Sequence, residues 1–126
     1  MSQVSVKVDA SGALRALERI RAKIQQLDPL LKIAAEAVVR DAQTFVPVDT
    51  GALRSSIHIE PGGVLGYKVI AGSPTTLNPR SGTPTSGYAS YVEFGTSRMR
   101  ARPYMRPALS KNIPAIFNLL KSMLRD

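Results

Sequence analysis

Few side chains in this sequence of 126 residues could perform catalysis. The chain has one histidine, His58, and no cysteine, which leaves no thiolate nucleophile and no zinc–thiolate site. The tripeptide Asp-Thr-Gly at positions 49–51 is typical of the aspartic protease loop. That mechanism needs two carboxylates that share a proton, and the tripeptide occurs only once. We therefore predict that the chain is not an enzyme and that it has no catalytic residue, no cofactor and no metal ion.

Partner contact is expected instead, above all in residues 88–109. This segment contains three of the four tyrosines, one of the three phenylalanines and four arginines. Aromatic side chains supply large, rigid contact areas, and arginine binds carboxylates with a defined geometry. With two residues of an earlier segment, these side chains form a candidate interface: Asp49, Arg54, Tyr91, Glu93, Phe94, Arg98, Arg100, Arg102, Tyr104 and Arg106.

Two interpretations of this candidate interface remain open. In the first, an arginine of the run Arg98, Arg100 and Arg102 pairs with Glu93 or Asp49 of a neighbouring subunit and sets the register of assembly. In the second, the charged residues pair within one subunit or face solvent, where each pair contributes about 0 to 1 kcal/mol. For the aromatic residues, packing in the core of their own subunit is the preferred interpretation.

Positive charge is concentrated at the end of the chain. The formal net charge is +8, and the residues from Thr96 onward include seven basic residues and one acid. Such an excess implies an anionic partner, which could be nucleic acid, an acidic protein surface or a membrane face. No helix-turn-helix, zinc-finger or RNA-recognition signature is present, so DNA contact would be weak, independent of sequence and sensitive to salt. The start of the chain resembles neither a secretory signal nor a membrane span, and we expect no membrane partner.

The first third of the chain is predicted to contain a strand and two helices. Leucines and isoleucines at spacings of three and four residues predict an amphipathic helix over 11–27. Asp28 and Pro29 form an N-cap followed by a proline in the first helical turn, so a second helix is expected to begin there and to end before Pro47. A short strand is predicted from three valines that alternate with polar residues, Val4, Val6 and Val8.

The rest of the chain is predicted to contain a hairpin, a loop and a helix. Apolar alternation over 57–71, interrupted by a Pro-Gly-Gly turn, predicts two antiparallel strands. Residues 72–87 are rich in Pro, Gly, Ser and Thr, which predicts a mobile loop. The last helix is expected to start at Pro103 or Pro107, while Pro114 should kink it or reset its start with Asn112 as a new N-cap.

Together these elements predict an α+β fold. A small antiparallel sheet, made of the short N-terminal strand and the 57–71 hairpin, is expected to pack against two N-terminal helices and a C-terminal helix. We expect a single domain over residues 1–126, with a mobile loop at 72–87 and a basic C-terminal helical segment at 103–126.

Two segments together resemble a known family. Residues 46–57 read Val-Pro-Val-Asp-Thr-Gly-Ala-Leu-Arg-Ser-Ser-Ile, and residues 88–109 contain Tyr-Val-Glu-Phe-Gly-Thr followed by Arg-Pro-Tyr-Met-Arg-Pro-Ala. They are similar to the paired signatures of the tail-completion, or head–tail joining, proteins of long-tailed bacteriophages and prophages. Tyr104 stands where phenylalanine is commoner in that family, and Arg100 where proline is often found. With its flanking helices, the resemblance covers nearly the whole chain.

The resemblance implies a non-enzymatic structural protein that acts in virion morphogenesis at the neck or the upper end of the tail. Proteins at that position assemble as homo-oligomeric rings, with phage neck and tail proteins as partners. It implies a protein found in the host cytoplasm during assembly and then in the virion, with at most weak, nonspecific DNA contact. The alternative function is a sequence-nonspecific nucleic-acid-binding protein that uses the basic C-terminal third of the chain.

Overall fold

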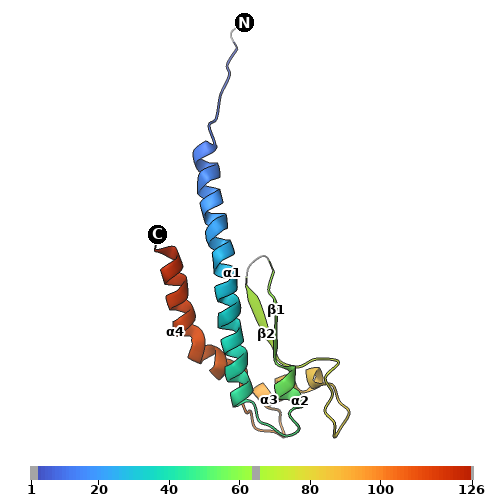
Figure 1. Ribbon diagram of the computed structural model, residues 1–126. Coiled ribbons are helices and arrows are strands. Elements are labelled where there is room, and N and C mark those ends of the chain that lie inside the picture. The colour runs from blue at the N-terminus through green and yellow to red at the C-terminus, as the bar shows by residue number, and fades with distance from the viewer. Residues whose placement is uncertain (1–2, 64–65, 126) are drawn as a thin grey trace.

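The computed structural model describes residues 3–63 and 66–125, and the chain is mostly helical. A long N-terminal helix, α1 (Ser11–Phe45), packs against a C-terminal helix, α4 (Met105–Leu124). A two-stranded antiparallel hairpin also lies beside α1 (Figure 1). The remaining elements, in chain order, are α2 (Ala52–Ser56), β1 (His58–Pro61), β2 (Tyr67–Ile70), a 3₁₀ turn η1 (Thr85–Gly87) and α3 (Ala89–Phe94). The predicted combination of helices with a small antiparallel hairpin is confirmed. The N-terminal strand, the number of N-terminal helices and the start of the last helix differ from the prediction.

The predicted N-terminal strand is wrong. Residues 3–10, which we call the N-terminal arm, form neither helix nor strand and extend from the far end of α1 (Figure 1). Val4, Val6 and Val8 are 90%, 79% and 83% exposed. A strand needs a partner for its backbone hydrogen bonds, and polar–apolar alternation cannot tell whether the same chain supplies that partner.

The two predicted N-terminal helices are one helix, because α1 continues through Pro29. A proline in a helix interior costs about 3 kcal/mol, since it lacks an N–H and clashes with the carbonyl four residues earlier. No glycine lies between residues 13 and 45 to add to this cost, so one proline does not end the helix. Asp28 therefore does not cap a helix. Its Oδ2 instead accepts a hydrogen bond of 2.9 Å from the Tyr67 hydroxyl, which ties the hairpin to α1.

The C-terminal helix also differs from the prediction at its start. It begins at Met105, between the two predicted prolines, and it continues through Pro114 with a change of direction along its length (Figure 1). Asn112 does not start a new helix. Its Nδ2 donates to the Ala108 carbonyl and to Asp41 Oδ2, both at 2.7 Å, so it links α4 to α1.

The predicted hairpin is confirmed. His58 pairs with Ile70 and Ile59 pairs with Val69 in an antiparallel register. Beyond the strands, the Gly62 N–H donates to the Gly66 carbonyl at 3.0 Å. Residues 64–65, which the sequence pattern placed in the second strand, lie outside the described residues.

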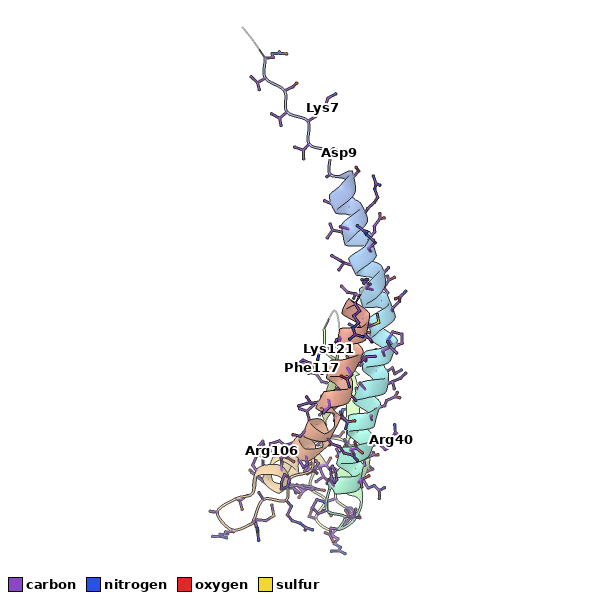
Figure 2. The ribbon with its side chains drawn as sticks, turned by 90° about the vertical axis from the view of Figure 1, so that its left-hand side faces the viewer. Lys7, Asp9, Arg40, Arg106, Phe117 and Lys121 are labelled. Atoms are coloured by element: carbon purple, nitrogen blue, oxygen red, sulfur yellow. The ribbon has the colours of Figure 1, made fainter. Side chains whose placement is uncertain are left out.

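The core lies at one end of α1 and leaves the other end projecting. Along the first half of α1, Leu14, Leu17 and Ile20 are each more than half exposed. Figure 2 shows Lys7 and Asp9 at the projecting end and Arg106 at the packed end. The buried residues come from the second half of α1, from α2 and α3, from the start of α4 and from the segments between them: Val38, Ala42, Val46, Leu53, Ile57, Ala89, Tyr104 and Ala108.

Candidate assembly surface

Residues 46–57, the first segment, and residues 88–109, the second segment, meet around one hollow at the packed end of the molecule. Its volume is about 280 Å³. The sequence alone could not show that these two segments are in contact, because about thirty residues separate them. One side of the hollow comes from the first segment and the other from the second, with Asn78 of the intervening loop between them: Pro47, Asp49, Thr50, Gly51, Leu53, Tyr88, Val92, Met99 and Arg102.

The first segment is held by turn chemistry. Gly51 has a φ of +81°, a left-handed conformation that glycine adopts without steric cost. Thr50 Oγ1 accepts a hydrogen bond of 3.3 Å from the Ala52 N–H at the start of α2. At the end of α2, the buried Ser56 Oγ accepts a hydrogen bond of 3.0 Å from the Gly72 N–H. The first segment thus also anchors the beginning of the 72–87 loop.

The 72–87 loop is held by hydrogen bonds between its own residues and by an ion pair with the first segment. Thr85 is fully buried, and its Oγ1 accepts from the Ser73 N–H at 2.8 Å and donates to the Ser73 carbonyl at 3.0 Å. At the outer part of the loop, Arg80 donates to Asp49 Oδ1 at 2.7 Å. Both members of this ion pair are about two-thirds exposed or more, so it contributes little to stability. Sequence reasoning missed Arg80 because a surface pair of this kind leaves no pattern, and the mobility of the loop remains a prediction.

Glu93 organises the second segment. Its side chain is 5% exposed. One carboxylate oxygen accepts hydrogen bonds from the backbone N–H groups of Tyr104 and Met105 at 2.8 and 2.9 Å. The other accepts from the N–H of Arg106 at 3.0 Å and from its Nε at 3.1 Å. Glu93 therefore caps the N-terminus of α4 from outside that helix, where free N–H groups and the helix dipole favour a negative charge.

The pKa of Glu93 reflects this arrangement. Burial of the carboxylate acts to raise the pKa, but the hydrogen bonds from the three backbone N–H groups and from the Arg106 side chain outweigh it, so the pKa lies below the ordinary value for glutamate. Glu93 therefore carries its charge at neutral pH. Pro107 follows Arg106 in α4. It has no backbone N–H and therefore needs no hydrogen-bond acceptor in the first turn of this helix.

Tyr104 belongs to the core of the subunit. It is 1% exposed, and its hydroxyl donates a hydrogen bond of 2.9 Å to the Ala89 carbonyl. Burial, with a smaller contribution from the nearby Glu93 charge, raises the pKa of Tyr104 to about 12. Two of the ten candidate interface residues, Glu93 and Tyr104, are thus buried in their own subunit.

Three arginines of the candidate interface lie around a tight loop that begins at Gly95. This glycine has a φ of +77°, and a Cβ atom there would lie 2.7 Å from the Ala101 nitrogen. The Arg102 N–H donates to the Val92 carbonyl at 2.8 Å and closes the loop. Arg98, Arg100 and Arg102 are exposed, and none of them forms a salt bridge with another residue in the part of the chain that the structure describes.

Exposed aromatic residues lie beside this loop on α3. Tyr91 is 54% exposed and Phe94 is 65% exposed. The Arg106 guanidinium carbon lies 5.0 Å from the centroid of the Phe94 ring, which is within cation–π distance. Arg54 on α2 is exposed as well. We call the exposed residues of the candidate interface the assembly surface: Asp49, Arg54, Tyr91, Phe94, Arg98, Arg100, Arg102 and Arg106.

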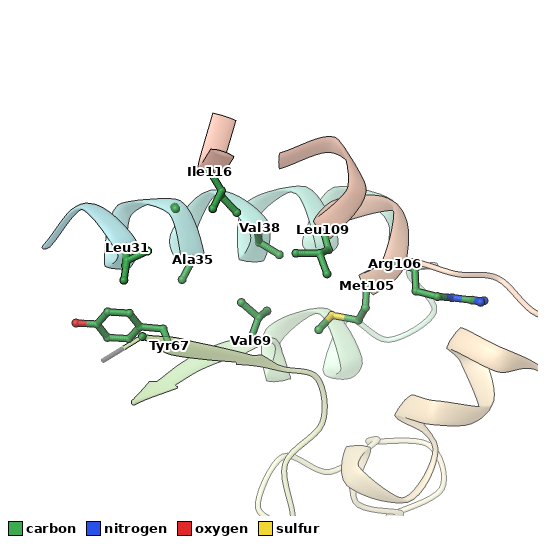
Figure 3. A pocket seen from close by; sticks show the side chains of 11 residues that line it. Leu31, Ala35, Val38, Tyr67, Val69, Met105, Arg106, Leu109 and Ile116 are labelled. Carbon is green, nitrogen blue, oxygen red and sulfur yellow. The ribbon is translucent and has the colours of Figure 1, made fainter. Parts of the chain in front are cut away.

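A second, more apolar groove lies between α1, β2 and α4 and has a volume of about 470 Å³. Figure 3 shows side chains from all three elements around it, including Val38, Val69 and Leu109. The groove could not be predicted from the sequence, because no local pattern reveals how far apart two helices and a hairpin will lie. The other lining residues are Leu31, Ala34, Ala35, Gly66, Tyr67, Met105, Arg106 and Ile116.

Among the described residues, the polar side chains outside the assembly surface show no arrangement for metal binding. His58 is tied to its own strand region, with Nδ1 at 2.6 Å from the Ser56 carbonyl and Nε2 at 3.1 Å from Glu60 Oε1. The hydrogen bond to Ser56 and then that to Glu60 raise the pKa of His58. Across residues 3–63 and 66–125, no group of three or more His, Cys, Asp or Glu side chains could hold a metal ion. No helix in the same ranges is long and apolar enough to cross a membrane.

A protein-family model matches residues 3–95 of the chain. The matching family is the HK97-gp10-like family, described as "Bacteriophage HK97-gp10, putative tail-component". The chain belongs to this family. The match includes the first segment and the second as far as Gly95, and it ends before Arg98 and α4. No curated protein and no solved structure shows significant similarity to the chain.

Membership of the HK97-gp10-like family confirms the resemblance to phage tail proteins. The protein is a phage tail component, which makes it a structural protein of the virion and not an enzyme. Its partners therefore include other tail proteins.

Proposed function

We propose that this tail component acts in head–tail joining, at the neck or the upper end of the tail, and that it does so by assembling into a ring of identical subunits. It would act in the host cytoplasm while particles assemble and remain in the virion afterwards. The observation that carries this proposal is the fixed loop of three exposed arginines beside two exposed aromatic residues. Arginine and aromatic residues are enriched among the residues that dominate protein interfaces.

The arginine loop is held in place by hydrogen bonds, and this rigidity favours a role in binding a partner. The loop is closed by the Arg102 N–H to Val92 carbonyl bond, and the following helix is capped by Glu93. A loop held at both ends loses little conformational entropy when a partner binds, so more of the contact energy remains as affinity. The Glu93 carboxylate is buried and bound within the subunit, whereas Asp49 is exposed and its pair with Arg80 is a weak surface pair. The neighbour's Asp49 is therefore the better partner for an arginine of this loop.

Charge reversal at Arg102 tests the proposal. The backbone N–H of Arg102 serves the fold, whereas its side chain forms no salt bridge among the described residues. Arg102→Glu should therefore leave the circular dichroism spectrum unchanged and block the formation of joined particles. Arg125→Glu is the matched control, because Arg125 is also exposed and lies at the far end of α4. Loss of folding in Arg102→Glu would instead make Arg102 a structural residue and remove the support for the proposal.

Nucleic-acid binding through the basic C-terminal third is the second candidate function. It is favoured by the same three exposed arginines, which could contact phosphates. A protein that surrounds a DNA conduit would hinder DNA passage if it bound tightly, so we expect only weak contact that falls steeply with salt. The test is a salt titration of binding to duplex DNA. Sub-micromolar affinity that persists near physiological salt would favour this function over ring assembly.

A further inference from the structure

The N-terminal arm and the apolar groove have complementary properties, and among the described residues neither the arm valines nor the groove is covered by another segment. The arm has strand-like alternation, with three exposed valines on one side and polar residues on the other. The groove is apolar and open, and its wall includes a strand of a two-stranded sheet. A free strand edge beside an apolar groove is a site where an extended segment can add to a sheet.

The free edge that borders the groove belongs to β2. Gly66, Tyr67 and Val69 line the groove, and no residue of β1 does. Along an antiparallel pair of strands, hydrogen-bonded residue pairs alternate with pairs whose N–H and C=O groups point away from the partner strand. Gly62 and Gly66 are hydrogen-bonded across the turn, so the N–H and C=O groups of Val69 point away from β1. Those groups can therefore bind one more strand, on the side where the groove lies.

The side chains of such a strand would match the groove. Tyr67 and Val69 point from β2 toward α1, where Ala35 and Val38 form the opposite wall (Figure 3). Successive side chains of a strand alternate between the two faces of a sheet. An added strand whose valines lie on the same face as Val69 would bury them in the groove and leave its polar residues outside.

Chain length excludes the arm of the same molecule from this position. Residues 3–10 extend from the N-terminus of α1, and a strand spans about 3.3 Å per residue, so Val4 lies at most about 23 Å from Ser11. Along α1, Ala35 is about 36 Å from Ser11 at 1.5 Å per residue. Val6 and Val8 reach still less far than Val4. The arm can fill the middle of the groove only in another copy of the chain.

We propose that the N-terminal arm of one subunit adds as a third strand to the β2 edge of the next subunit and buries its valines in the groove between α1, β2 and α4. This contact is heterologous, because arm and groove are different surfaces, and repeated contacts of that kind close into a ring when the rotation allows. The inference rests on the proposed self-assembly, and it names one interface through which self-assembly occurs.

Cysteine cross-linking between two variants of the full chain tests the exchange. The natural chain has no cysteine, so introduced thiols react only with one another. Val4→Cys, Val6→Cys and Val8→Cys would each be mixed with Val69→Cys and oxidised, and paired strands bring Cα atoms within the range of a disulfide. Leu109→Cys on the α4 wall is a second acceptor, in case Val69→Cys fails to fold by circular dichroism. Ser81→Cys in the exposed loop is the matched control acceptor.

The proposal predicts a disulfide-linked dimer between at least one arm variant and Val69→Cys or Leu109→Cys, and none with Ser81→Cys. Absence of the dimer at both groove positions, or equal yield with Ser81→Cys, would overturn the arm exchange. The same variants would be tested for incorporation into phage tails. Normal joined particles without the cross-link would overturn the exchange alone, whereas particles that join normally without this protein would overturn the proposed function.

Discussion

At the scale of residues, Glu93 is the side chain on which the geometry of the assembly surface depends. It joins α3 to the first turn of α4 through three backbone N–H groups and Arg106. Because these donors would be left without an anion, Glu93→Gln should lower the free energy of unfolding by about 2 kcal/mol in urea denaturation at pH 7. The control, Glu60→Gln, changes an exposed residue and should cost less than about 0.5 kcal/mol.

The same group predicts a dependence of stability on pH. The pKa of Glu93 is lower in the folded protein than its ordinary value of 4.5, so the stabilisation is fully present above pH 4.5 and is lost as the pH falls through the folded pKa. The difference between the wild-type chain and Glu93→Gln should therefore shrink as the pH falls below 4.5. A difference that stayed constant from pH 7 to pH 3 would mean that the Glu93 charge does not contribute.

At the scale of elements, the arginine loop depends on a glycine. Gly95→Ala would force both an unfavourable φ and a contact of 2.7 Å with the Ala101 nitrogen, so we expect a loss of about 2 kcal/mol in stability together with weaker particle joining. Gly82→Ala is the control, since Gly82 has a φ of +71° but nothing within 4 Å of an added Cβ. Equal losses in the two variants would show that backbone conformation, and not the crowded loop, determines the effect.

The elements also show what the sequence could predict. The hairpin was predictable because alternation and a Pro-Gly-Gly turn are local signals. The predicted break at Pro29 was wrong. Asp-Pro can start a helix or lie inside one, and the other residues of α1 stabilise the helix enough to offset one interior proline. The role of Glu93 could not be predicted in detail, since its donors lie more than ten residues away and meet it only after α3 and α4 have packed.

At the scale of the whole molecule, the candidate interface divides into two parts. Glu93 and Tyr104 are buried and stabilise the subunit, and Arg106 binds Glu93 within it. Arg98, Arg100, Arg102 and the aromatic residues on α3 are exposed. The family match, over residues 3–95, includes Asp49, Arg54, Tyr91 and Phe94 of the assembly surface but ends before Arg98 and α4.

The role of the arginine loop in assembly is best measured by the amount of this protein in purified, joined phage particles that carry Arg102→Glu or Arg125→Glu. If the loop is an assembly surface, Arg125→Glu will be present in joined particles at the wild-type amount. Arg102→Glu will yield a folded protein with the wild-type circular dichroism spectrum and no joined particles. Joined particles with a normal amount of Arg102→Glu protein would contradict the claim that the arginine loop is an assembly surface.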